Sequence, residues 1–217
     1  MPLAKPPFPP KVHIVDDEPA VRESIATLLS TAGIESITHE SAEAFLASGA
    51  HKAPVCAIVD NRMTGMSGLD LLRRLKDLRS EATIIMLTGH ADVPTAVAAM
   101  KFGAFHFVEK PFDGEALLSA VEEALSRADK IGDEIAETNA FAQRYQSLTV
   151  REAEVFSLLM EGLPTKAIAA KLDITGRTAE HHRAAVMRKL EARSISHLMR
   201  IALNVNRPLN DAKESTR

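Results

Sequence analysis

Cysteine is almost missing from this 217-residue chain, whose single thiol is Cys56. One thiol excludes an internal disulfide and a cysteine-based zinc site, and its place in an apolar run indicates a packed, inert side chain. Long apolar runs are missing too, because the longest, such as Val55–Val59, reach only the length of a strand. The Pro-rich segment Pro2–Pro10 lacks the apolar core of a secretory signal. We therefore expect a cytoplasmic protein without a membrane partner.

Charge is present in ordinary amount but is unevenly distributed. Hydrophobic residues make up 46% of the chain and charged residues 25%, which is typical of folded domains, and the length suits two of them. Residues 147–217 carry 12 Lys and Arg against 8 Asp and Glu, a net charge of +4, whereas residues 1–146 carry 14 against 21, a net charge of −7. The basic end is compatible with a polyanionic partner, although many solvated helices carry a similar excess.

Short apolar runs alternate with amphipathic stretches from Val12 to about Arg127. The runs predict five strands, at Val12–Val15, Ile34–Thr38, Val55–Val59, Ile84–Leu87 and Ala104–Val108. The stretches between and after them predict five helices, near Ala20–Ala32, Ala42–Ala47, Leu69–Leu78, Thr95–Phe102 and Glu115–Arg127. This alternation predicts an α/β fold, a doubly wound five-stranded parallel sheet, whose chemistry lies beyond the carboxyl ends of its strands.

The next segment, residues 128–147, is helical in pattern. Apolar or small residues recur at alternating spacings of four and three, at Leu117, Val121, Ala124, Ala128, Ile131, Ile135, Thr138, Ala142 and Tyr145. Such spacing is that of a coiled-coil seam, so the fifth helix could continue through the linker and pair with a second chain. Gly132 and Thr138 argue against a tight coil, and a helical tether without a partner fits the pattern equally well.

The end of the chain is purely helical in pattern. Helices are predicted at Val150–Glu161, Thr165–Leu172, Thr178–Leu190 and Ile195–Leu203, followed by a polar tail, Asn210–Arg217. The predicted organisation is thus a Pro-rich tail (1–10), an α/β domain (11–127), a helical linker (128–147) and an all-α four-helix domain (148–217).

Polar residues lie at the carboxyl ends of the predicted strands, where we expect the chemistry of this fold. Asp16 and Asp17 follow the first strand, Asp60 the third, Thr88 ends the fourth, and Lys110 follows the fifth. Each alone is usually a cap or a solvated side chain, but capping does not predict one set at each strand end. Three carboxylates so close together need a cation, and Mg²⁺ suits oxygen ligands. Asp60 could then attack a phosphoryl group, with Lys110 and Thr88 binding its oxygens.

The segments VDDE, DNRMTGMSGLD, LTGHADVP and FVEKPF resemble a receiver domain of the response regulator superfamily, especially the FixJ-type regulators, over roughly Lys11–Arg127. The resemblance implies that Asp60 is the phosphoacceptor and that a sensor histidine kinase is the donor. It implies a site for Mg²⁺ or Mn²⁺ made by Asp17 and Asp60 directly, by Asp16 through water and by the Arg62 carbonyl. Thr88 and Phe107 fall on the switch positions, and the Lys110–Pro111 bond is expected to be cis.

One position departs from the receiver pattern. Thr64 stands where the family usually has proline. Since proline stiffens a loop, Thr64 is expected to loosen it and to affect the lifetime of the phosphoryl group, not its formation.

A short helix containing Lys166–Leu172, a tight turn and a longer helix from Thr178 have the layout of a helix-turn-helix. On the longer helix Ala179, His182, Val186 and Leu190 share a face that should pack on the core. The other side presents Glu180, His181, Ala184 and Arg188, while Lys166, Arg177 and Arg183 could reach phosphates. A basic helical bundle has the same pattern. His181 and His182 are adjacent, so they point apart and are poorly placed to share a metal ion.

Nearly the whole segment from Leu148 to Leu203 is similar to the LuxR/NarL-type DNA-binding domain. The resemblance implies that Glu180, His181 and Ala184 face the bases and that Lys166 and Thr178 contact the DNA backbone. Three departures, Ala179 for Val, Pro164 for Ser and Ala167 for Glu, alter core packing and the start of the first helix of the motif without removing a basic side chain.

Together the two resemblances imply a two-component response regulator, not an enzyme, that dimerises on phosphorylation, binds double-stranded DNA and acts on RNA polymerase. Two alternative functions make different demands on the sequence. A magnesium-dependent phosphohydrolase needs a carboxylate two residues after its nucleophile, and that position is Arg62. A receiver that no longer accepts phosphate could serve as a protein-binding module, which Thr64 leaves open.

Overall fold

The structure is a computed structural model that describes residues 11–89 and 93–206. It divides into two compact units, Met1–Gly132 and Asp133–Arg217, and each is described by itself. The Pro-rich tail (1–10), residues 90–92 of the LTGHADVP segment and the polar tail Asn210–Arg217 lie outside the described residues.

The first unit is built on a five-stranded parallel sheet. Its strands are β1 (Val12–Val15), β2 (Ser36–His39), β3 (Cys56–Asp60), β4 (Thr83–Thr88) and β5 (His106–Glu109), in the order β2-β1-β3-β4-β5. β1, β3 and β4 are buried along their whole length, which explains why their sequences are apolar with little alternation. The predicted doubly wound α/β fold is confirmed.

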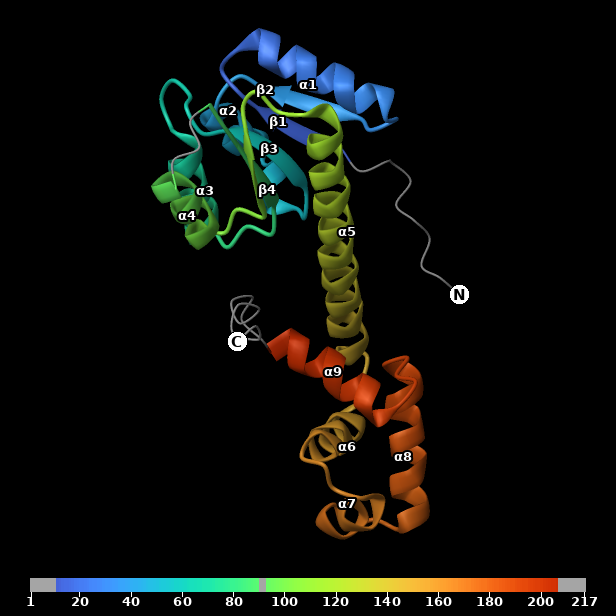
Figure 1. Cartoon of the computed structure of the whole chain (residues 1–217). Helices are drawn as coiled ribbons and strands as arrows, with labels where there is room; N and C mark the ends of the chain where they lie inside the picture. Colours follow the sequence, from blue (N-terminus) through green and yellow to red (C-terminus); the bar gives the residue numbers. More distant parts are fainter. Residues whose placement is uncertain (1–10, 90–92, 207–217) are drawn as a thin grey trace. The chain divides into compact units, whose positions relative to one another are not determined.

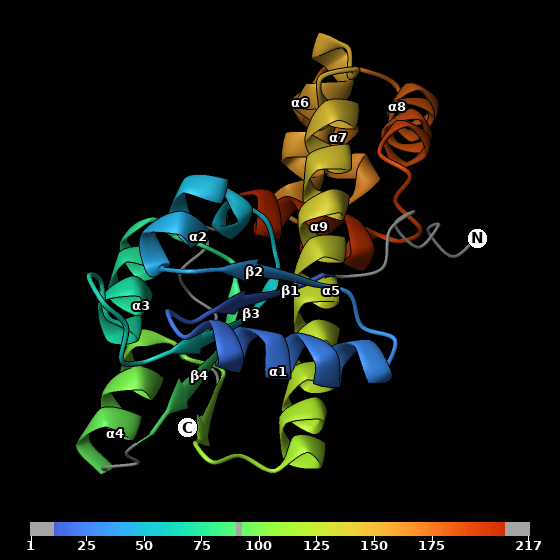
Figure 2. The same cartoon turned by 90° about the horizontal axis from the view of Figure 1, so that it is seen from above.

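Helices cover both faces of this sheet. The helix α1 (Pro19–Thr31) and the first turns of α5 (Gly114–Tyr145) pack on one face, whereas α2 (Ala42–Ser48), α3 (Gly68–Asp77) and α4 (Val93–Phe102) pack on the other (Figure 1). A short 3₁₀ turn, Ala50–Lys52, follows α2. Figure 2 shows the same two layers of helices, one on each face of the sheet, from above. Because side chains alternate along a strand, Ile14 and Ile58 join the first layer while Val15 and Val59 join the second.

The helix α5 continues without a break through the predicted linker, for 32 residues. The expected continuation of the fifth helix is therefore confirmed. However, Leu117, Val121 and Ala124, the first positions of the predicted coiled-coil seam, are fully buried in the core between α5 and the sheet. These three side chains are not available to a second chain, so the seam prediction is wrong for this half of the helix. Pairing through the later positions stays a prediction.

Every regular element among the described residues of the second unit is a helix. It comprises the end of α5, α6 (Val150–Met160), α7 (Thr165–Lys171), α8 (Gly176–Lys189) and α9 (Ile195–Asn206). Its core is formed by buried residues from all five helices, among them Phe141, Val155, Leu159, Ile168, Val186, Leu190 and Leu198. The helix α8 begins at Gly176, two residues before the predicted Thr178, because the Thr175 side chain caps it by accepting a hydrogen bond from the Thr178 N–H.

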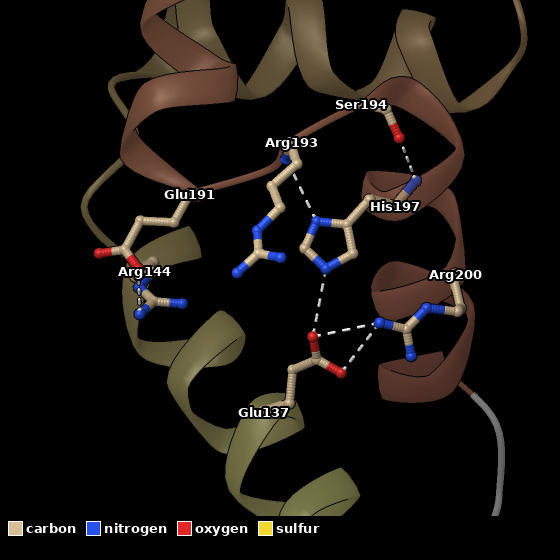
Figure 3. Close-up of polar contacts among 7 residues, drawn as sticks. All are labelled: Glu137, Arg144, Glu191, Arg193, Ser194, His197 and Arg200. Atoms are coloured by element: carbon tan, nitrogen blue, oxygen red, sulfur yellow. Dashed lines mark hydrogen bonds and ion pairs between the residues drawn. The ribbon is translucent and has the colours of Figure 1, made fainter. Parts of the chain in front are cut away.

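Polar contacts join α9 to the last turns of α5 (Figure 3). Glu137 on α5 accepts hydrogen bonds from His197 Nε2 (3.2 Å) and Arg200 Nη2 (3.2 Å) on α9. The Arg193 N–H donates to His197 Nδ1, which leaves Nε2 as the protonated nitrogen that faces Glu137. A second ion pair, Arg144 with Glu191 at 2.6 Å, lies nearby. The end of α5 is therefore an integral part of the second unit.

Candidate functional site

The structure brings an acidic pair and a lysine together at the carboxyl edge of the sheet. Asp16 follows β1, Asp60 ends β3 and Lys110 follows β5. Lys110 Nζ lies 2.7 Å from Asp16 Oδ2 and 2.7 Å from Asp60 Oδ1. The ammonium thus bridges two carboxylates that are far apart in the sequence.

Both carboxylates of this pair are buried and hydrogen-bonded. Asp16 is 1% exposed, and its Oδ1 accepts the Glu18 N–H at 2.9 Å. Asp60 is 5% exposed, and its Oδ2 accepts the Arg62 N–H at 2.7 Å. Every carboxylate oxygen therefore has a partner, as burial of charge requires. Arg22 supports the same corner by donating to the Asp16 carbonyl at 2.7 Å.

Burial and charge act in opposition on the titration of this cluster. Burial raises the pKa of Asp60, although the hydrogen bond and charge of Lys110 oppose the rise. Burial alone would lower the pKa of Lys110, but hydrogen bonds and charges from Asp16 and Asp60 together raise it. Lys110 therefore remains an ammonium at neutral pH. A divalent cation beside Asp60 would favour its ionised, nucleophilic form.

Asp17 is held differently. Its Oδ2 accepts two hydrogen bonds from Thr64, one from the backbone N–H and one from the hydroxyl, both at 2.8 Å. The backbone bond, followed by the hydroxyl bond, lowers the pKa of Asp17. The structure thus joins Thr64 to Asp17 through two hydrogen bonds. Proline, the usual residue of the family at this position, could donate neither bond.

The oxygen donors of this edge are of the kind that Mg²⁺ prefers. Within residues 11–89 and 93–206, no three acidic, histidine or cysteine side chains lie where they could hold a metal ion together. The reason is visible in the contacts: Asp16 and Asp60 face Lys110, and Asp17 faces Thr64. A shallow hollow of about 540 Å³, open to solvent, adjoins Asp17 and is lined also by Arg62 and Thr64. The donor set fits Mg²⁺ in chemical type, provided that Asp17 turns toward Asp60.

The remaining predicted residues of this edge occupy the expected elements. Thr88 ends β4, is 1% exposed, and its carbonyl accepts the Lys110 N–H at 2.6 Å. Phe107 on β5 is half-buried and packs against the layer that contains α4. Arg62 is exposed. The Lys110–Pro111 peptide bond is cis, as the resemblance implies.

The helix α8 separates a buried face from an exposed one. Ala179, Val186 and Leu190 are buried and His182 is half-buried, as the spacing predicts. The exposed side presents Arg177, Glu180, His181, Ala184 and Arg188, and Lys166 is exposed on α7.

Two predicted DNA contacts make internal bonds. Arg183 Nη1 donates to Thr165 Oγ1 at 3.2 Å, across to the start of α7, and the guanidinium lies 3.9 Å from Glu180. The Thr178 hydroxyl lies 2.8 Å from that of Thr175. Both side chains would have to exchange these partners, or share them, to reach a phosphate.

Sequence reasoning missed several polar contacts. Glu152 accepts the Thr149 N–H at 2.7 Å, while its own N–H donates to Thr149 Oγ1 at 3.3 Å, and Lys189 Nζ lies 2.6 Å from Glu152 Oε2. The Thr-x-x-Glu spacing of this capping box is a local signal that could have predicted it. No local signal announces the bonds from Thr64 to Asp17 or from the Met66 N–H to Glu43 Oε1 (2.9 Å).

No helix among residues 11–89 and 93–206 has both the length and the apolar character that crossing a membrane requires.

Comparison with known families agrees with this geometry. The response regulator receiver domain matches residues 12–122, and the bacterial regulatory proteins of the luxR family match residues 146–202. The transcriptional regulatory protein FixJ of Rhizobium meliloti (strain 1021) is 46% identical over 88% of this chain and 94% of its own length. The C4-dicarboxylate transport transcriptional regulatory protein DctR of Rhodobacter capsulatus is 43% identical over 88% of this chain and 98% of its own.

Solved structures resemble the whole chain as well. The response regulator StyR, with 37% identity, aligns with a TM-score of 0.73 over 90% of this chain and 99% of that one. Full-length FixJ from B. japonicum, with 39% identity, aligns with a TM-score of 0.54 over 91% of this chain and 97% of that one. The chain therefore belongs to the response regulators that carry a receiver domain followed by a LuxR-type DNA-binding domain, the family of the FixJ transcriptional regulators.

Proposed function

We propose that a sensor histidine kinase phosphorylates Asp60 and that this modification switches dimerisation and sequence-specific DNA binding. The observation that carries the proposal is the Lys110 ammonium, 2.7 Å from both Asp16 and Asp60. A cation fixed beside a buried carboxylate is what a phosphoryl group needs, because catalysis of its transfer consists largely of positioning and charge compensation.

The positions of Lys110, Asp16 and Asp60 support the following transfer. An oxygen of Asp60 attacks phosphorus as the bond from phosphorus to the kinase imidazole breaks. The phosphoryl group moves to Asp60, the electron pair of the broken bond stays on the imidazole nitrogen, and a proton on the ring, taken from water, lets the histidine leave as neutral imidazole. Lys110 neutralises a phosphoryl oxygen, and the Thr88 hydroxyl donates a hydrogen bond to another. A Mg²⁺ or Mn²⁺ ion held by Asp17, Asp60, the Arg62 carbonyl and, through water, Asp16 would supply further positive charge.

The switch would then act on the face of the sheet that α2, α3 and α4 cover. When Thr88 moves toward the phosphoryl group, Phe107 turns inward and the surface of α4, β5 and α5 changes. Val97, 45% exposed on α4, lies on that surface. Dimerisation there would bring two α8 helices onto neighbouring half-sites and convert a weak monomer contact into a stable one.

The exposed side of α8 supports a DNA-binding role for this helix. Glu180, His181 and Ala184 would face the bases in the major groove, whereas Lys166, Arg177, Thr178, Arg183 and Arg188 would contact phosphates or support the helix on them. Bound in this way, the protein would act on RNA polymerase in the cytoplasm. We assign residues 11–127 to the receiver, 128–147 to a helical linker whose last turns pack with the second unit, and 148–217 to the DNA-binding domain.

The test is phosphorylation in the presence of Mg²⁺ and acetyl phosphate, followed by intact mass measurement. Wild type should gain one labile phosphoryl group that hydroxylamine removes, and Asp60→Asn should gain none, whereas the exposed control Asp70→Asn should behave as wild type. Wild type that stays unmodified would contradict the proposal and favour a receiver used only as a protein-binding module. Sustained hydrolysis of a small phosphate ester would favour the phosphohydrolase that Arg62 argues against.

A further inference from the structure

Thr64 joins two loops that are 47 positions apart in the sequence. Its backbone N–H and its hydroxyl both donate to one oxygen, Asp17 Oδ2, at 2.8 Å. The loop that carries Thr64 is fixed on its other side, because the Met66 N–H donates to Glu43 Oε1 at 2.9 Å. Gly65 between them has φ +84, a conformation that suits glycine, and a Cβ there would lie 2.9 Å from Glu43 Oε1.

These two hydrogen bonds to one oxygen determine where the Asp17 carboxylate points. Asp16 and Asp60 share Lys110, whereas Asp17 is directed to Thr64, and within residues 11–89 and 93–206 no three acidic side chains lie together as a set of ligands. Hydrogen bonds from neutral donors to a carboxylate are stronger than those between neutral groups. A cation that binds through Asp17 Oδ2 must therefore displace Thr64 or share that oxygen with it.

We propose that Thr64 is a positioning residue that holds Asp17 away from Asp60 and competes with the divalent cation, so that it raises the Mg²⁺ concentration at which the site fills. This inference rests on the proposed function, since it assigns Asp17 to the metal. It concerns the affinity of this chain for the ion, not the identity of the ligands.

A different role for the same bonds predicts the opposite sign. Residues that hydrogen-bond a metal ligand often orient it and thereby strengthen metal binding. If Thr64 acted so, its removal would weaken Mg²⁺ binding. The direction of the change in Kd therefore separates competition from support.

The test is a calorimetric titration of the full-length chain with MgCl₂, using a graded series at position 64. Thr64→Ser keeps both donors and should keep the wild-type Kd. Thr64→Val keeps the shape and the N–H but loses the hydroxyl, and should lower the Kd about threefold, since about half of the bonding is lost. Thr64→Pro loses both donors and should lower the Kd about tenfold.

Two controls isolate the contribution of the Thr64 hydroxyl to the Kd. Thr38→Val makes the same chemical change at an exposed position of β2 and should leave the Kd unchanged. In an Asp17→Asn background, Thr64→Val should no longer strengthen binding, because the carboxylate that the two groups compete for is gone. A purely mechanical effect of proline on the loop would change Thr64→Pro and leave Thr64→Val at the wild-type value.

An equal or higher Kd for Thr64→Val would overturn the inference while leaving the proposed function intact, provided that wild type binds Mg²⁺. Wild type that binds no Mg²⁺ would overturn both. Variants that fail to fold would show themselves by circular dichroism, and Thr64→Ser against Thr64→Val, the two mildest changes, decides the result.

Discussion

At the scale of single residues, two buried histidines stand out. His13 on β1 and His39 on β2 are 6% and 8% exposed, their rings are stacked, and His13 Nδ1 lies 2.9 Å from His39 Nε2. One imidazole must therefore donate a hydrogen bond to the other. This contact disfavours protonation of both rings, which would place two positive charges side by side. Burial lowers the pKa of both, and that of His13 falls to about 4, with the charge of His39 contributing.

This pair predicts a loss of stability in mild acid. An unfolded histidine takes up its proton near pH ~6.5. Because the folded values are lower, the unfolded chain binds more protons below that pH, so stability is fully present above pH ~6.5 and falls as the pH approaches 4. The loss from His13 should reach about 3 kcal/mol by pH ~4.

The measurement is urea unfolding followed by circular dichroism between pH 7 and pH 4. The double variant His13→Phe, His39→Phe should show a shallower decline in the free energy of unfolding than wild type. The control His106→Gln, at an exposed position of β5, should keep the wild-type slope. Parallel slopes for all three proteins would contradict the assignment.

The sequence identifies some of these residues and not others, for a physical reason. Asp16, Asp60 and Lys110 could be predicted to meet because the ends of parallel strands lie at one edge of the sheet. The contacts of Asp17 with Thr64 and of His13 with His39 depend on loop geometry and side-chain direction, which no local pattern encodes. The expected looser loop at Thr64 stays a prediction, which considered only the missing proline ring and not the two donors that Thr64 directs to Asp17.

At the scale of helices and strands, the apolar pattern predicted the type and order of every strand and α-helix, with bounds shifted by a few residues apart from the extension of α5, but it did not predict the 3₁₀ turn Ala50–Lys52. β2 begins at Ser36 and not Ile34, and β5 at His106 and not Ala104. Gly103, with φ +101, turns the chain just before β5, and Ala104 is buried in that turn, so its apolar character reflected burial and not strand. The α5 seam misled for a similar reason: one apolar stripe can serve the core of its own domain or a partner helix.

The start of α6 gives a prediction at this scale. Glu152 closes the capping box with Thr149 and pairs with Lys189 at the end of α8, and these bonds, led by that from Lys189, lower the pKa of Glu152 to about 2. Glu152→Ala should cost about 2 kcal/mol of unfolding free energy, and Glu152→Gln about half as much, since glutamine can keep the bond to the Thr149 N–H. The contribution should be present above pH ~4.3 and be lost as the pH falls toward 2.

Tyrosine fluorescence reports this change in the unfolding free energy selectively, because the signal comes from the second unit. Tyr145 is the single tyrosine of a chain without tryptophan, and its ring packs edge-on against Phe156 of α6, 5.1 Å between centroids. Glu154→Gln removes a carboxylate of α6 that pairs with Arg151 at 2.8 Å and lies outside the capping box, so it is the control for loss of a carboxylate. Equal unfolding midpoints for Glu152→Ala and wild type would show that the capping box adds nothing to the stability of the protein.

At the scale of the whole molecule, the proposed regulation requires two chains to meet after phosphorylation. Cys56 is buried, and burial raises the pKa of its thiol to about 12, so it should stay unreactive. A cysteine placed at the half-buried Ile135 would then be the reactive thiol. If the later part of α5 pairs with its copy, Ile135→Cys should form a disulfide dimer when the protein is phosphorylated. Wild-type protein is the control. No crosslinked dimer in either phosphorylation state would leave α5 as a tether.

Dimerisation itself has a simpler readout. The mass of the native protein in solution should double when acetyl phosphate and Mg²⁺ are added, and it should stay that of a monomer for Asp60→Asn. An unchanged monomer for phosphorylated wild type would remove the dimerisation step from the proposed mechanism, even if DNA binding still responded.

The most direct test of the central claim is a DNA-binding titration of wild type and Asp60→Asn, with and without acetyl phosphate, at two salt concentrations. Wild type should bind its operator more tightly after phosphorylation, Asp60→Asn should not respond, and affinity should fall steeply with salt, because lysine and arginine contacts to phosphates release counterions. Equal affinity of phosphorylated and unphosphorylated wild type at both salt concentrations would contradict the claim that Asp60 controls the DNA-binding domain.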